Sequence, residues 1–294
     1  MKSRDASLRR HETLRQGVCR NVELLVNSVA ANLGQSRNGE QSTHRIRTTI
    51  KRLRALLRLI RPAVEPAFFD HENERLRTAA RILSFARDAE VARDTLKTLP
   101  VRSRSAREAV NAALPSLEKR VERAKAHQPN LAQVKHGLEQ TRRRFQGLKL
   151  RGTDQEIIKA GIKKVYRQGR QRMKSAIQTD QAIAYHRWRI RAKNLYYELQ
   201  FLEPVWPKRL HSMISRLSKL QDRIGLEHDL TDLREELKKT PEVFGGQEAV
   251  NHIISCLDQQ TDKLRRAAEP LGRKIWRQKP RRFSRRLERH WCNR

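Results

Sequence analysis

One segment of the sequence occurs twice, 142 residues apart, and no other feature restricts the fold as strongly. The first copy covers residues 44–62 (HRIRTTIKRLRALLRLIRP) and aligns without gaps to residues 186–204 (HRWRIRAKNLYYELQFLEP). Seven of the 19 positions are identical, including the leading histidine, a lysine and the closing proline. Such a repeat predicts two similar structural units in one chain. We expect two lobes at 1–148 and 153–270, joined by a glycine-flanked linker, and a basic tail or helix at 271–294.

Apolar residues elsewhere follow the spacing of amphipathic helices. Leu210, Ile214, Leu217 and Leu220 are one example of the i, i+4, i+7 pattern. The 12 glycines and 10 prolines gather between such segments, and no stretch alternates as a strand would. We therefore predict an all-α protein of about eight to ten long, antiparallel helices, each of roughly 15–30 residues.

A helical projection divides each repeat into a basic face and an apolar face. The basic face of the first copy carries His44, Arg47, Lys51, Arg54 and Arg58, and that of the second carries His186, Arg189 and Lys193. Arg45, Arg52 and Arg187 flank these faces. The apolar faces carry Ile46, Ile50, Leu53, Leu57 and Ile60 in one copy and Trp188, Ala192, Leu195, Leu199 and Leu202 in the other. The alternative interpretation is that these faces only make the protein soluble. Repulsion between like charges on one face destabilises a helix, so a solubilising face would normally include acidic residues. The occurrence of the same pattern in both copies therefore favours a binding surface.

The charge of the whole chain indicates what such a surface would bind. There are 65 lysines and arginines against 32 acidic residues, a formal net charge of +33. Nucleic acid, polyphosphate and an anionic membrane surface would each neutralise this charge. A row of guanidinium and ammonium groups suits an extended chain of phosphates, and histidine adds a donor that titrates near neutral pH.

The paired His-x-x-Arg-x-x-x-Lys-x-Leu segments resemble the conserved histidine α-helical domain, or CHAD, family. Each is followed by a helix with a charged pair, Arg87-Asp88 in one half and His228-Asp229 in the other. The resemblance implies two helical bundles related by a pseudo-twofold axis around a basic central groove or pore. It also implies binding of inorganic polyphosphate by the basic-face residues, and association with polyphosphate granules. For Arg87 and His228, a structural role beside the aspartates is an equal alternative.

Two departures from the family pattern matter. Asn194 and Tyr196 stand where the first copy has Arg52 and Arg54, so the second basic face should be weaker. Some members of the family also carry a triphosphatase domain with a Glu-x-Glu-x-Lys motif. The nearest string here, from Glu72 to Leu76, lacks the lysine, so we expect a stand-alone domain.

Enzyme and metal signatures are missing from the sequence. It contains no GxxxxGK[ST], GxGxxG or GxSxG motif, and the string that begins at His71-Glu72 lacks the second histidine of a zinc protease. Cys19, Cys256 and Cys292 are too scattered for a zinc site or a disulfide framework. We expect a binding protein without cofactor or metal rather than an enzyme.

The remaining expectations concern location, partner and tail. With no signal peptide and no apolar span, we expect a cytoplasmic protein, at polyphosphate granules if the resemblance holds. Nucleic-acid binding through the same faces is the main alternative, although the repeats carry few aromatics for base stacking. Residues 273–294 hold ten lysines and arginines with Trp276, Phe283 and Trp291 between them. This segment is a loosely packed terminal helix, an extra polyanion-binding arm, or a helix docked through its aromatics.

Overall fold

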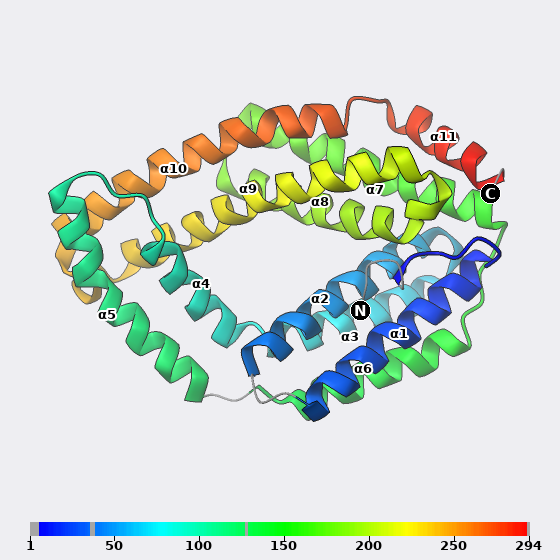
Figure 1. Cartoon of the computed structure of the whole chain (residues 1–294), viewed down its shortest axis with the longest axis horizontal. Coiled ribbons are helices and arrows are strands. Elements are labelled where there is room, and N and C mark those ends of the chain that lie inside the picture. The colour runs from blue at the N-terminus through cyan, green and yellow to red at the C-terminus, as the bar shows by residue number, and fades with distance from the viewer. Residues whose placement is uncertain (1–5, 36–38, 127–128, 293–294) are drawn as a thin grey trace.

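The structure, a computed structural model, describes residues 6–35, 39–126, 129–292 of the chain. Within these ranges every regular element is helical, which confirms the all-α prediction (Figure 1). The helices are α1 (Leu14–Gln35), α2 (Gly39–Leu59), α3 (Pro66–Ile82), α4 (Phe85–Lys97), α5 (Arg104–Ala126), α6 (Leu131–Gln146), α7 (Asp154–Thr179), α8 (Ala182–Leu202), α9 (Pro207–Lys239), α10 (Gly246–Ile275) and α11 (Pro280–Cys292). None of these helices is long and apolar enough to cross a membrane.

The helix ends follow the expected breakers. Pro66 and Pro207 occupy the first turns of α3 and α9, where a missing backbone N–H costs nothing. Thr153 and Glu156 form a capping box at the start of α7, directly after the predicted linker. Gly245 separates α9 from α10 with a φ of 92°, a left-handed conformation that favours glycine.

The described residues form eleven α-helices, slightly more than the eight to ten that the sequence predicted. One extra break separates α3 from α4 at Leu83 and Ser84, where the sequence has neither glycine nor proline. A Nη1–H of Arg47 on α2 donates a hydrogen bond of 2.7 Å to the Leu83 carbonyl. That carbonyl is thus satisfied from another helix, which periodicity within one segment does not reveal.

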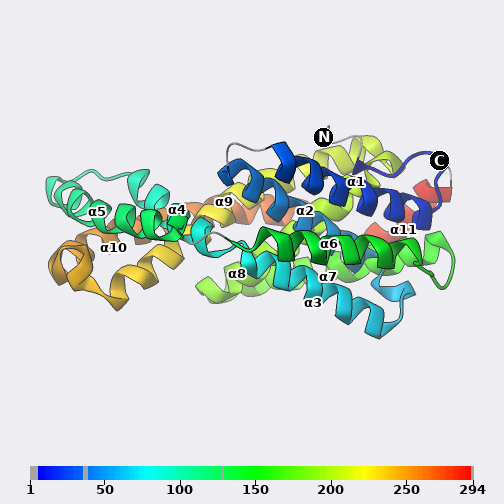
Figure 2. The same cartoon turned by 90° about the horizontal axis from the view of Figure 1, so that it is seen from below.

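Two hydrophobic cores hold the molecule together, and each draws on both halves of the chain. The larger core combines α1, α2, α3 and α6 with α7, α8, α11, the first part of α9 and the last part of α10. The smaller combines α4 and α5 with α10 and the second part of α9. Figure 2 shows that α4, α5 and α10 form a narrower end of an elongated molecule. The boundaries of the predicted lobes stay a prediction, because the cores extend across them.

Helix positions nevertheless recur at the spacing of the repeat. Adding 142 to the bounds of α2 (39–59) gives 181–201, against 182–202 observed for α8. The same shift takes α5 (104–126) to 246–268, and α10 begins at 246. The halves differ where α3 and α4 correspond to the single helix α9. The pseudo-twofold axis and the central groove or pore stay predictions.

The basic tail ends in a docked helix. Phe283, Leu287 and Trp291 of α11 are buried in the larger core, and the Phe283 ring stacks on Tyr166 of α7 with centroids 4.5 Å apart. Of the alternatives for this segment, a helix docked through its aromatics is the observed one. Arg281, Arg282, Arg285 and Arg289 are exposed, whereas the guanidinium of Arg286 lies over the Trp206 ring.

A glycine sets how closely the two halves approach. A Cβ on Gly161 of α7 would overlap the carbonyl oxygen of Leu59 at the end of α2. We expect Gly161→Ala to destabilise the protein by about 1–3 kcal/mol, since overpacking outweighs the helix propensity that alanine adds. Gly225→Ala, in the interior of α9 with open space around its Cβ, is the matched control and should stabilise by about 0.5–1 kcal/mol. Urea denaturation followed by circular dichroism measures both, and equal effects would contradict the close approach.

Candidate functional site

The apolar faces of the two repeated helices are buried as predicted. The buried residues are Ile46, Ile50, Leu53, Leu57 and Ile60 on α2 and Trp188, Ala192, Leu195, Leu199 and Leu202 on α8. The helices α2 and α8 pack against each other. They run in the same direction, because Lys51 of α2 lies near Arg189 of α8, and Arg58, further along α2, lies near Glu198, further along α8. Burial of these faces therefore fixes the rotation of each helix.

Four motif cations meet beside this contact. Arg47 and Lys51 of α2 lie near Arg189 and Lys193 of α8, close enough that their charges lower one another's pKa. Arg87, at the start of α4, affects Lys51 in the same way. We call these five residues the central cation cluster. Equivalent positions of the two repeats thus lie close together, and whether they bind a ligand as one site stays a prediction.

The two lysines of the cluster are the most strongly perturbed cations. Burial, reinforced by Arg47 and Arg189, lowers the pKa of Lys51 to about 8. Burial and the charges of Arg189 and Lys51 lower that of Lys193 to about 7. The described residues place no salt-bridge partner on either ammonium group. Without an anion, the site therefore sheds part of its positive charge at neutral pH.

Three carboxylates stand behind the cations. Burial raises the pKa values of Asp88, Asp229 and Asp232, the last to about 6, while Arg47 or Arg189 opposes the shift. The negative charge of these three carboxylates offsets only part of the positive charge of the central cation cluster. In the part of the chain that the structure describes, no three histidines, cysteines or carboxylates are arranged to hold a metal ion.

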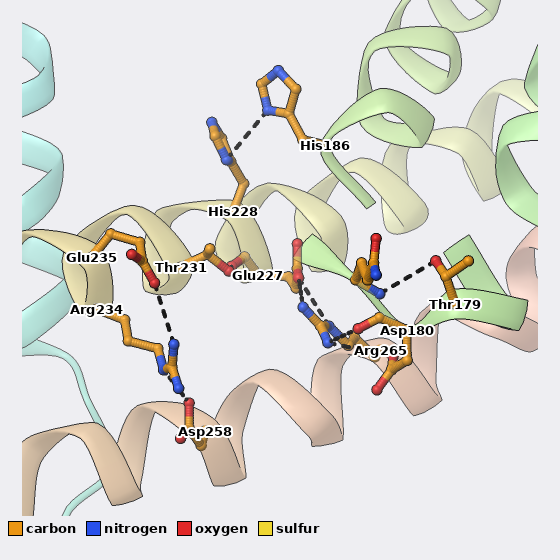
Figure 3. A network of polar contacts seen from close by, with 11 residues as sticks. Thr179, Asp180, His186, Glu227, His228, Thr231, Arg234, Glu235, Asp258 and Arg265 are labelled. Atoms are coloured by element: carbon orange, nitrogen blue, oxygen red, sulfur yellow. Dashed lines mark hydrogen bonds and ion pairs between the residues drawn. The ribbon is translucent and has the colours of Figure 1, made fainter. Parts of the chain in front are cut away.

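The second repeat's histidine is held in a chain of polar contacts. His186 Nδ1 lies 3.4 Å from His228 Nδ1, and His228 Nε2 lies 3.3 Å from an oxygen of Asp232 (Figure 3 shows the histidine pair). Burial, with the charges of Arg189 and His186, lowers the pKa of His228 to about 3, so this ring is neutral at pH 7. If its Nε2–H donates to Asp232, its Nδ1 accepts the Nδ1–H of His186. The outer nitrogen of His186 then carries a lone pair, and it donates to an anion only when the ring is protonated, a form that a bound phosphate favours.

The first repeat's histidine has a different setting. His44 is exposed, and the described contacts give it no counterpart of His228. Partial desolvation, together with the charges of Lys51 and Arg87, lowers the pKa of this exposed ring, and burial with Arg189 lowers that of His186. Both rings therefore become charged at a lower pH than the sequence analysis assumed.

The other predicted cations do not join the cluster. Arg54 and Arg58 lie further along α2 and contact α3 instead. An Nη of each lies 3.4 Å from the side-chain oxygen of Asn73. Arg52 lines a crevice with Tyr197 on another flank of the α2–α8 contact. Arg45 and Arg187 are exposed. The cluster consequently receives one arginine and one lysine from each repeat, so the substitutions at Asn194 and Tyr196 do not weaken the second half at this point.

A salt bridge positions the helices that carry the histidines. Arg265 of α10 donates to buried Glu227 of α9 at 2.7 Å and to the backbone oxygen of Asp180 at 2.6 Å (Figure 3). Its guanidinium also lies over the ring of Tyr185, 4.6 Å from the centroid. Asp180 ends α7 in a left-handed conformation, so this contact holds the α7–α8 turn against α9 and sets where His186 meets His228.

Sequence reasoning missed Asp232. It follows His228 by four residues on a helix, a spacing that places the two side chains on one face and could have revealed the contact.

The comparisons with known proteins agree with the observed fold. The family model described as the CHAD domain matches residues 21–238. The crystal structure of the CHAD domain from the plant Ricinus communis superposes with a TM-score of 0.64 at 18% sequence identity, covering 94% of this chain and 96% of that one. The search of curated proteins gave no match. The family model covers well over half of the chain, and on that match the protein belongs to the CHAD domain family.

Proposed function

We propose that the protein binds inorganic polyphosphate through the central cation cluster, as a binding protein rather than an enzyme. The observation that carries the proposal is the meeting of Lys51 and Lys193, both half-buried and without a carboxylate partner, between two arginines. Burying unpaired like charges is unfavourable in the free protein. A phosphate chain would supply the missing counter-charge and restore the protonated lysines.

The arrangement of donors also suits this ligand. Arg47 and Arg189 offer forked N–H groups and the lysines compact charges, a combination that fits successive phosphates along a chain. The proposal includes His44 and His186 as flanking donors, and Arg54 and Arg58 as a continuation along α2. A cytoplasmic location at polyphosphate granules is part of the same proposal.

Nucleic acid remains the second candidate, because a net charge of +33 attracts any polyanion. Reading bases requires open aromatic faces or donors arranged for base edges. The central cation cluster contains no aromatic side chain, so it offers no surface on which successive bases could stack.

Competition between ligands tests this proposal. We expect long-chain polyphosphate to displace a labelled polyphosphate probe at least about tenfold better than tRNA of equal total charge, at about 0.15 M salt. Fluorescence anisotropy measures the displacement, and gel analysis of the recovered polyphosphate should show an unchanged chain length. Equal competition by tRNA would transfer the assignment to nucleic acid, and shortened chains would overturn the assignment as a binding protein.

A further inference from the structure

A second concentration of cations lies where α10 ends against α7. A pocket of about 460 Å³ is lined there by Arg170 and Lys174 of α7 and by Arg273 and Arg277 at the end of α10. Met173 and Trp276 contribute apolar surface, and no carboxylate is among the lining residues. Arg273 is paired with Glu269 at 2.6 Å, which leaves the other three cations to face the pocket.

Further arginines of α9 and α11 lie near this pocket. Burial lowers the pKa of Arg209, and the charges of Arg216, Arg286 and Arg277 lower it further. Arg277 therefore lies near both the pocket and Arg209, although Arg209 itself is not among the lining residues. We call the cavity lined by Arg170, Lys174, Arg273 and Arg277 the α7–α10 arginine pocket.

The charge of the pocket indicates what it would hold. Its lining includes four cations and no carboxylate, and mutually repelling guanidinium groups around one cavity favour an anionic ligand. Arg209 Nε, Trp276 Nε1 and Gln278 Oε1 are buried in this region without a hydrogen bond to any described residue. Only Trp276 lines the pocket, however, and its Nε1 lies against Gly169 of α7, so the proposal rests on the cations.

The α7–α10 arginine pocket is separate from the central cation cluster. The Trp188 ring of α8 is fully buried and lies directly against Gly272 of α10 and Met173 of α7, where an added Cβ would collide with it. This apolar layer stands between the pocket and the basic face of α8. Consistently, none of the pocket's cations contributes to the lowered pKa values of Lys51 and Lys193.

We propose that the α7–α10 arginine pocket is a second binding site for inorganic polyphosphate, so that one protein molecule holds two segments of phosphate chain. The identity of the ligand rests on the proposed function, whereas the existence of a second anion site does not. A base-free chain fits better than nucleic acid because the local aromatic rings are already covered. Trp276 is 1% exposed, and Trp206 is stacked by His290 with centroids 4.4 Å apart and covered by Arg286.

Two sites on one molecule have a consequence that one site lacks. A protein with two separate sites links different chains, or distant parts of one chain, into a network. Long polyphosphate should therefore condense with this protein, which is the behaviour expected of a granule component.

Isothermal titration with tripolyphosphate tests the second site. The wild-type protein should show two binding events, and Lys174→Gln with Arg277→Gln, both exposed positions, should weaken one of them about tenfold or more. Lys51→Met with Lys193→Met should weaken the other. Lys238→Gln with Lys239→Gln, exposed at the end of α9, removes the same charge elsewhere and should leave both events unchanged. In light scattering, the pocket variant should also fail to condense long-chain polyphosphate.

The outcomes separate this inference from the proposed function. If the pocket variant keeps both binding events, or the Lys238/Lys239 control loses the same one, the second site is wrong. Loss of all binding on substitution of Lys51 and Lys193 would overturn it as well. If only the pocket variant binds more weakly, the second site stands and the central assignment falls. If the pocket variant loses affinity for an RNA oligonucleotide but not for tripolyphosphate, the pocket is a nucleic-acid site and the proposal fails.

Discussion

Replacing Lys51 and Lys193 together with methionine is expected to weaken polyphosphate binding at the central cation cluster about 100-fold near pH 7 while making the free protein more stable. Each lysine would donate to a charged phosphate, a contact worth about 1.5–3 kcal/mol, and the sum is reduced because both lysines are partly deprotonated in the free protein. Stability should rise because a buried, unpaired ammonium is replaced by an apolar side chain of similar length. Anisotropy titration and urea denaturation measure the two effects, which have opposite directions.

Substitution of the lysines tests the binding site more specifically than substitution of the neighbouring arginines. Arg47 also holds the Leu83 carbonyl between α3 and α4, so its removal would disturb the fold as well as the site. Lys238→Met with Lys239→Met is the matched control for lost charge, and we expect less than about a threefold loss of affinity, because exposed charges are screened by salt. A double variant at Lys51 and Lys193 that binds as tightly as the control would refute the central site. Separate single variants should show coupled losses, since both lysines contact one ligand.

Much of the fold could be predicted because it depends on local periodicity. The spacing of Ile46, Ile50 and Leu53 required a buried face, and the faces of both repeats are buried as expected. The repeat also placed α2 and α8 in equivalent positions, and helix bounds recur at the same 142-residue spacing. These features were accessible because each is encoded within one helix or by direct comparison of two.

The features that the sequence did not reveal depend on contacts between helices. The break at Leu83 and Ser84 has no glycine or proline to mark it. Arg52 and Lys51 are adjacent in sequence, yet only Lys51 lies in the cluster, because its direction depends on the packing of α2 against α8. The lowered pKa values of the lysines likewise need both burial and the neighbouring repeat.

Polyphosphate affinity of the central cation cluster is also expected to fall steeply as pH rises from about 7 to about 9, by roughly 500-fold in the limit where only the doubly charged lysine pair binds. With pKa values of about 7 and about 8, Lys193 and Lys51 lose their protons across this range in the free protein. A bound phosphate chain favours the charged ammonium and raises both pKa values, so binding takes up protons. Internal phosphates of the chain stay fully ionised throughout, and the change therefore belongs to the protein.

Titration calorimetry in buffers of different ionisation enthalpy measures this proton uptake directly. The Lys51→Met, Lys193→Met variant is the control, because it should bind weakly with little dependence on pH over the same range. The stability of the free protein should change with pH in the opposite direction to its affinity for polyphosphate. Its buried lysines bind fewer protons when folded than when unfolded, so these two groups make the fold more stable as pH rises above about 7. His228, whose pKa of about 3 lies far below this range, contributes to neither effect. Affinity that is constant between pH 7 and 9, with no proton uptake, would show that neither lysine contacts the chain.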